Sequence, residues 1–240
     1  MGTYLTHIPY TNGDLLSLAL TFNQIVETGT ADAVTLETIN EHGLAPAKAL
    51  VASTTALSAA EGAERAARAE EVKSEDEADD VLREAFTTAH IRGGAEAKTT
   101  LKSTSGGRTY GEVVKLHGQE QVRVVRDITT QAKAAPDRLG FSAGHLERIE
   151  TTNEALATHN AARQAAELHS AAALLTRRQD EASFAAAARV VVRILTALHG
   201  RDKLATILPR FEHPKSSKAA ETTQTAETAG TTETSGGSAS

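Results

Sequence analysis

The apolar residues of this chain are mostly alanine, and this restricts the kind of core that it can build. Hydrophobic residues make up 40% of the chain, but aromatic residues only 3%, and there is no tryptophan. Burial stabilises a fold by about 25 cal/mol per Å² of apolar surface, so each alanine contributes little. Long, closely packed helices can still bury enough area. The sequence therefore predicts an all-α protein, an up-down bundle of about four long helices.

The end of the chain has the composition of a disordered tail. From Pro214 to Ser240 it is rich in Thr, Ala, Glu, Ser and Gly, with no apolar residue larger than alanine. Such a segment cannot bury enough surface to offset the entropy cost of ordering. We therefore expect a helical bundle domain over 1–213 and a disordered tail over 214–240.

Caps and glycines divide the first half of the chain into helices. A helix is expected after Asn12, as N-cap, and Gly29 should end it; its one apolar stripe is made of Leu15, Leu18, Phe22 and Ile25. A short helix over 31–40 and a long one over 46–90 follow. Ser74 begins a segment with the form of a capping box, which favours a second helix start there. Residues 93–111 are rich in Gly, Ser, Thr and Lys, and we expect a loop.

The segment 112–133 is ambiguous because it contains many β-branched residues and a His117-Gly118 pair suited to a hairpin turn. We prefer a helix for 121–132, where apolar residues recur at helical spacing. A lone hairpin would also need further strands, which the rest of the chain does not supply.

The last helix is expected to run from Ser142, as N-cap, to Gly200, as the residue after the C-cap, over about 85 Å. Near its end a 4-3-4-3 stripe predicts the seam of an antiparallel bundle or coiled coil. The stripe comprises Phe184, Ala188, Val191, Leu195 and Leu198. Arg163 is expected on a polar outer face. After Gly200 a short cap should fold back, using Leu204, Ile207, Leu208 and Phe211.

Charge is uneven along the chain: 61–84 is strongly acidic and 177–210 is basic. Two interpretations are open, that the segments face each other or that each is a solvated helix face. The net charge of −6 and the lack of aromatic residues among the arginines disfavour nucleic-acid binding. A DNA-associated protein remains an alternative, based on Arg178, Arg189 and Arg193 of one helix.

Catalytic and metal-binding patterns are absent from the sequence. There is no cysteine, no Glu-x-x-His or His-x-x-x-His spacing among the nine histidines, and no Gly-x-Ser-x-Gly. A metal site between helices, using His90, His117 and glutamates, is an open alternative. The sequence favours a non-enzymatic protein without a cofactor.

One loop has residues suited to an anion. Backbone N–H groups, hydroxyls and basic side chains of 98–108 could turn toward a phosphate, although no phosphate-binding motif is matched. The candidates are Lys98, Lys102, Ser105, Gly106, Gly107 and Arg108. The alternative function is therefore a ligand-binding or enzymatic bundle that uses this loop, and the competing interpretation is a mobile connector.

The leading hypothesis is a helical scaffold or protein-protein interaction module that self-associates. Alanines in the middle of the last helix permit close approach of another helix. The expected interaction surface is Ala161, Ala162, Ala165 and Ala166. The rival interpretation is that the long helix over 46–91 covers this surface. With neither a signal sequence nor an apolar run of about 20 residues, we expect a cytoplasmic protein with no membrane contact.

Overall fold

The computed structural model describes residues 12–208, and these residues form helices and no strand. The helices are α1 (Asn12–Thr28), α2 (Ala33–His42), α3 (Leu44–Thr104), α4 (Tyr110–Val113), α5 (Gly118–Ala134), α6 (Pro136–Leu139) and α7 (Ala143–Ile207). The all-α class is confirmed, as is the helix at 121–132. The predicted tail over 214–240 and the predicted cap residue Phe211 lie outside the described residues.

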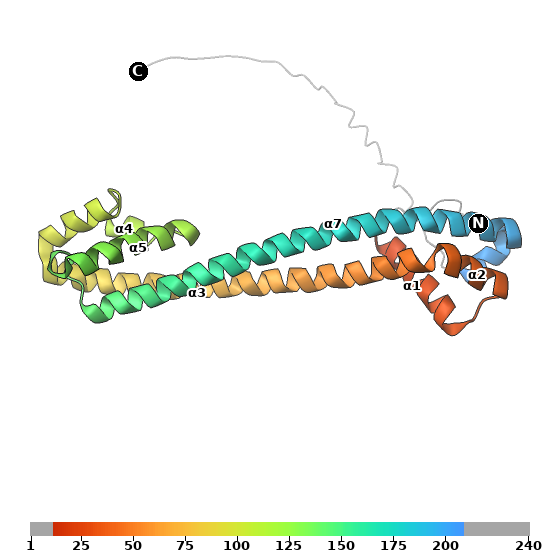
Figure 1. Ribbon diagram of the computed structural model, residues 1–240, viewed down its shortest axis with the longest axis horizontal. Coiled ribbons are helices and arrows are strands. Elements are labelled where there is room, and N and C mark those ends of the chain that lie inside the picture. Colours follow the sequence, from red (N-terminus) through yellow and green to blue (C-terminus); the bar gives the residue numbers. More distant parts are fainter. Residues whose placement is uncertain (1–11, 209–240) are drawn as a thin grey trace, which may run out of the picture.

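Two long antiparallel helices, α3 and α7, extend along most of the molecule (Figure 1). The straight part of α3, 44–93, is about 75 Å long at 1.5 Å per residue. Helices α1 and α2 pack at one end, which we call the proximal head. Helices α4 to α6 pack at the other end, the distal head (Figure 1). The expected bundle of about four long helices is thus replaced by two long helices with a small head at each end.

Ion pairs between α3 and α7 define their register. Arg163 pairs with Glu71 (2.6 Å) and Arg148 pairs with Glu84 (2.9 Å). Each residue of α3 therefore faces the residue of α7 whose number is about 234 minus its own. The acidic segment 61–84 therefore lies opposite residues near 150–173. The interpretation that it faces the basic segment 177–210 is wrong, because that segment begins further toward the proximal head.

The proximal head has a core of large side chains from α1, α3 and α7. Phe22 and Phe184 meet edge to face at its centre, with ring centroids 5.6 Å apart. Most of the expected stripe is buried there: Phe184, Ala188, Val191 and Leu195. Leu198 is 54% exposed and its predicted burial is wrong; at this level α7 turns the neighbouring His199 toward α2, where it hydrogen-bonds with Thr35 (3.0 Å).

The chain folds back after α7 as expected. Gly200 adopts a left-handed backbone (φ 73°) that changes the direction of the helix. The residues that follow it return to the proximal core, where Leu204 and Leu208 are buried and Ile207 packs against them. The predicted N-cap of α7 is also confirmed, because the Ser142 hydroxyl accepts a hydrogen bond from the His145 N–H (3.2 Å).

Two boundaries predicted for α3 are wrong. The helix does not restart at Ser74, which is buried in the contact with α7. The loop predicted over 93–111 is largely helical, because α3 resumes after a kink and continues to Thr104. The kink is at Gly94 (φ 59°, ψ −141°), a backbone conformation that side chains strongly disfavour. Glycine there interrupts the helical backbone, and the helix resumes after it in a new direction.

Leu195→Asp should lower the free energy of unfolding by about 4 kcal/mol, because it places an unpaired carboxylate in the proximal core. Leu198→Asp is the matched control three residues away, at an exposed position, and should change it by less than about 1 kcal/mol. Urea unfolding followed by circular dichroism measures both. Equal effects would show that the buried face of α7 is wrongly assigned.

Gly140→Ala should lower the free energy of unfolding by about 2 kcal/mol or more. Residue 140 has φ 70°, and an added Cβ would lie 2.8 Å from the Ala89 carbonyl oxygen. Gly62→Ala is the control within a regular helix, where a Cβ meets nothing within 4 Å. That change should stabilise the protein by roughly 0.5–1 kcal/mol. Thermal melts of both variants distinguish these outcomes, and a neutral Gly140→Ala would contradict the close approach.

Candidate functional site: the middle of the stalk

The stalk is the part of the α3–α7 pair between the two heads, and its contact surface follows a seven-residue repeat. Successive repeats of α3 place Leu50, Leu57, Glu64, Glu71 and Ala78 toward α7. The apolar residues lie near the heads and the glutamates lie between them. The seam between the helices is therefore apolar at both ends and polar in the middle.

The same change occurs on α7. Four consecutive seam positions in its middle are polar, namely Asn160, Arg163, Glu167 and Ser170. The nearest fully buried apolar seam residues are Leu156 on the distal side and Phe184 on the proximal side, with only the half-buried Leu174 between them. The central seam thus gains little of the apolar burial that stabilises both heads.

A network of charges connects the helices at this point. The Arg163 guanidinium contacts Glu71, whose side chain is 11% exposed, and also pairs with Glu167 on its own helix. Arg68 of α3 approaches Glu167 from the opposite side (3.5 Å). The contact with Glu71 raises the pKa of Arg163 against the opposing effect of desolvation. Arg163 therefore belongs to the seam, and its predicted place on a polar outer face is wrong.

The outer side of α7 is apolar at the same level. Five exposed residues follow one another here at spacings of 4, 3, 4 and 3, and we call them the outer stripe. They are Ala161, Ala165, Leu168, Ala172 and Leu175. Leu168 is 74% exposed and Leu175 60%. Of the expected surface alanines, Ala161, Ala162 and Ala165 are exposed and Ala166 is half-buried. In this chain α3 packs on the polar seam and leaves the three exposed alanines uncovered.

The heads cover one flank of the helix pair only at its two ends. Ala47 is buried with α1 in the proximal core, and Glu75 accepts a hydrogen bond from the Gly118 N–H at the start of α5 (2.9 Å). These residues are four seven-residue repeats apart, so they lie on the same flank of α3. Val51 and Val72 occupy the same position of the seven-residue repeat. Val51 is half-buried against the proximal core, whereas Val72, in the stalk, is 51% exposed. The middle of this flank is therefore open.

The six anion-site candidates are distributed over a helix end and a turn. Lys98 and Lys102 lie in the last part of α3, while Ser105 to Arg108 form the turn that follows. Within the turn, the Gly107 N–H donates to the Lys102 carbonyl oxygen (2.7 Å) and the Ser105 hydroxyl donates to the Arg108 carbonyl oxygen (2.7 Å).

Acidic side chains also use donors of this region. The Arg108 guanidinium donates to Glu120 (2.5 Å), and the Thr109 N–H donates to Glu112 (2.6 Å) and holds the pKa of that carboxyl below its ordinary value. An incoming anion would have to compete with these contacts. Anion binding by the turn remains a prediction.

Residues 12–208 contain no group of three or more His, Asp or Glu side chains arranged to hold a metal ion. His117 lies 3.8 Å from Glu75, and His90 lies beside an apolar pocket of the distal head. The two histidines proposed as metal ligands thus belong to separate surroundings.

Within 12–208, one helix, α7, meets the length and composition of a membrane span. An 18-residue window of α7 has a mean hydropathy of 1.4, and 28% of this window is buried in the protein. Such a window is only weak evidence for a membrane span, since long helices packed in soluble proteins meet the same criterion.

No protein-family model, curated protein or solved structure matches this chain.

The central residues that sequence reasoning missed are Glu71, Leu168 and Leu175. Their signal was present in the seven-residue spacing of Glu64 with Glu71 and of Leu168 with Leu175. Charged residues occupy the seam at this level, so apolar periodicity does not mark it in the sequence.

Double-mutant cycles should show that Glu71 and Arg163 are coupled by about 1 kcal/mol, because truncating either leaves a poorly solvated charge. The matched control is Glu84 and Arg148, an exposed pair between the same helices, with an expected coupling of a few tenths of a kcal/mol. Urea unfolding of the alanine variants gives both values. Similar coupling in the two pairs would refute the special place of Glu71 in the seam.

Proposed function

We propose that this protein is a non-enzymatic helical scaffold that acts by self-association, with the outer stripe of α7 as the contact between two copies. The observation that carries the proposal is the exposure of Leu168 and Leu175 in a row of alanines on the solvent side of α7. Exposed leucines are common singly, but two on one stripe beside small residues form a surface that a helix fits.

The alanines allow close approach of the partner. Ala161, Ala165 and Ala172 add no bulk beyond Cβ, so a second helix can pack near the α7 backbone while the leucines fill the space between. The stripe over 161–175 spans about 21 Å, or four helical turns. None of its five residues is charged, so its burial carries no ionic desolvation cost.

A second copy is the occupant that these features favour. In an antiparallel arrangement, Leu168 of one chain lies beside Leu175 of the other, and a twofold axis passes near Ala172. Both leucines then become buried by an identical surface. The polar seam adds a further reason, because the middle of the stalk gains little apolar burial within one chain and would gain it at this contact.

The extent of the stripe predicts moderate affinity. A stable interface of standard size uses roughly 20–30 residues on each side, more than the outer stripe and its neighbours supply. We therefore expect association at micromolar concentration. The cytoplasm is the proposed location, since the chain has no cysteine that an oxidising compartment would pair.

Leu168→Glu with Leu175→Glu should abolish self-association, because it places charges at the centre of the proposed contact. Size exclusion with light scattering between about 1 and 200 μM should show the wild type shifting from monomer to dimer and the variant remaining monomeric. Both positions are exposed, so helicity should not change.

The matched control is Leu20→Glu with Leu198→Glu, which changes two exposed leucines of the proximal head and should leave the dimer intact. Ala162→Glu with Ala166→Glu, beside the stripe, should also weaken the dimer. A wild-type monomer throughout the concentration range contradicts the proposal, as does a dimer that survives the stalk variant.

A further inference from the structure

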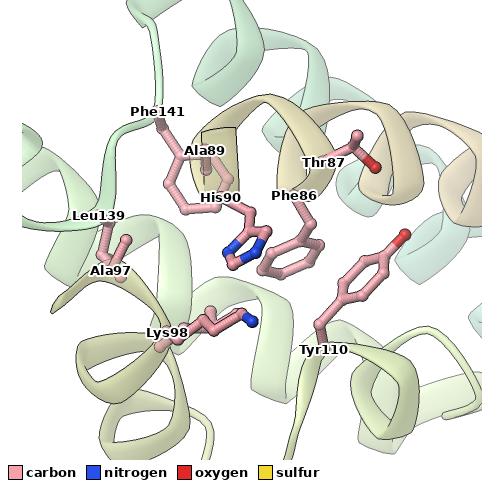
Figure 2. A pocket seen from close by; sticks show the side chains of 10 residues that line it. Phe86, Thr87, Ala89, His90, Ala97, Lys98, Tyr110, Leu139 and Phe141 are labelled. Atoms are coloured by element: carbon pink, nitrogen blue, oxygen red, sulfur yellow. The ribbon is translucent and has the colours of Figure 1, made fainter. Parts of the chain in front are cut away.

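The distal head contains a pocket of about 320 Å³ that opens where α3 bends (Figure 2). Its lining comes from both sides of the kink and from the segments that pack against it: Phe86, Thr87, Ala89, His90, Ala97, Lys98, Leu101, Tyr110, Leu139 and Phe141. The kink at Gly94 turns the last part of α3 back, which brings Ala97 and Leu101 near Phe86. The shape of the pocket thus depends on the backbone of one glycine.

The walls of the pocket are apolar and held in place by ring contacts. Phe86 lies 5.5 Å from Phe141 and 5.0 Å from Tyr110 between ring centroids. Phe86, Leu139 and Phe141 are buried in the distal core, so the walls are part of a packed structure. Small-molecule sites are typically such apolar hollows with a few polar groups at defined places.

The polar groups at this pocket are the hydroxyls of Thr87 and Tyr110 and two basic side chains, His90 and Lys98. Figure 2 shows the imidazole of His90 and the side chain of Lys98 close to each other beside the ring of Phe86. Both residues are exposed, and neither forms a hydrogen bond or ion pair with any side chain that the structure describes. The lysine is a cation at the edge of an apolar hollow, with its charge available to a ligand.

We propose that this pocket binds a small monocarboxylate with an apolar body, such as a medium-chain fatty acid. The hydrocarbon portion lies against Phe86, Leu101 and Phe141, and the carboxylate pairs with Lys98 next to His90. The volume, at the low end of the usual range for ligand sites, limits the body to a short chain. This site is independent of the outer stripe, so either proposal can fail without the other.

Octanoate is the probe, and isothermal titration calorimetry on the full chain is the measurement. Octanol, which keeps the body without the charge, and acetate, which keeps the charge without the body, separate the two contributions. Octanoate should bind with a dissociation constant below 1 mM and at least fivefold more tightly than octanol. Acetate should show no binding at that concentration.

Two variants locate the site. Lys98→Gln should weaken octanoate binding about fivefold, whereas Lys102→Gln, one turn further along α3 and outside the pocket, should leave it unchanged. Ala97→Leu should block binding by filling the hollow, with a thermal melt to check folding. If that variant does not fold, the comparison of Lys98→Gln with Lys102→Gln still tests where octanoate binds. Equal binding of octanoate and octanol, equal effects of the lysine variants, or no binding at 1 mM overturns the proposal.

Discussion

The antiparallel pairing of α3 with α7 is the constraint on which the rest of the structure depends. It places the proximal and distal heads at opposite ends and determines which face of each helix remains in solvent. The contact of Arg163 with Glu71 lies near its middle, where a shift of register would leave a poorly solvated carboxylate unpaired. The pair thus favours this register over a shifted one.

Stability is distributed unevenly along this pair. Phenylalanine, leucine and valine gather in the two heads, whereas polar residues occupy the central seam. The same stretch of α7 presents leucines outward, which is the reverse of a helix stabilised only within its own chain. This inversion of polarity is the physical basis for proposing that the stalk is completed by a second copy.

Local signals predicted much of this fold. Ser142 as N-cap and Gly29 after α1 defined helix ends correctly because capping depends on neighbouring residues. A break from residue 93 was expected, and Gly94 does interrupt the helical backbone there, but the helical segment that continues to Thr104 was not expected. The inward place of Arg163 was missed because seam positions were expected to be apolar. The pocket joins Phe86, Tyr110 and Phe141, which are too far apart in sequence for any spacing to reveal.

The central claim is that the outer stripes of two copies meet in antiparallel orientation, and cross-linking tests it most directly. The chain has no cysteine, so Ala172→Cys introduces a single thiol near the proposed twofold axis. Mild oxidation at micromolar concentration should give a disulfide-linked dimer with unchanged helicity, while Ala59→Cys, at an exposed position of α3, should stay monomeric. Absence of a cross-link at residue 172, or equal cross-linking of the two variants, would contradict the account.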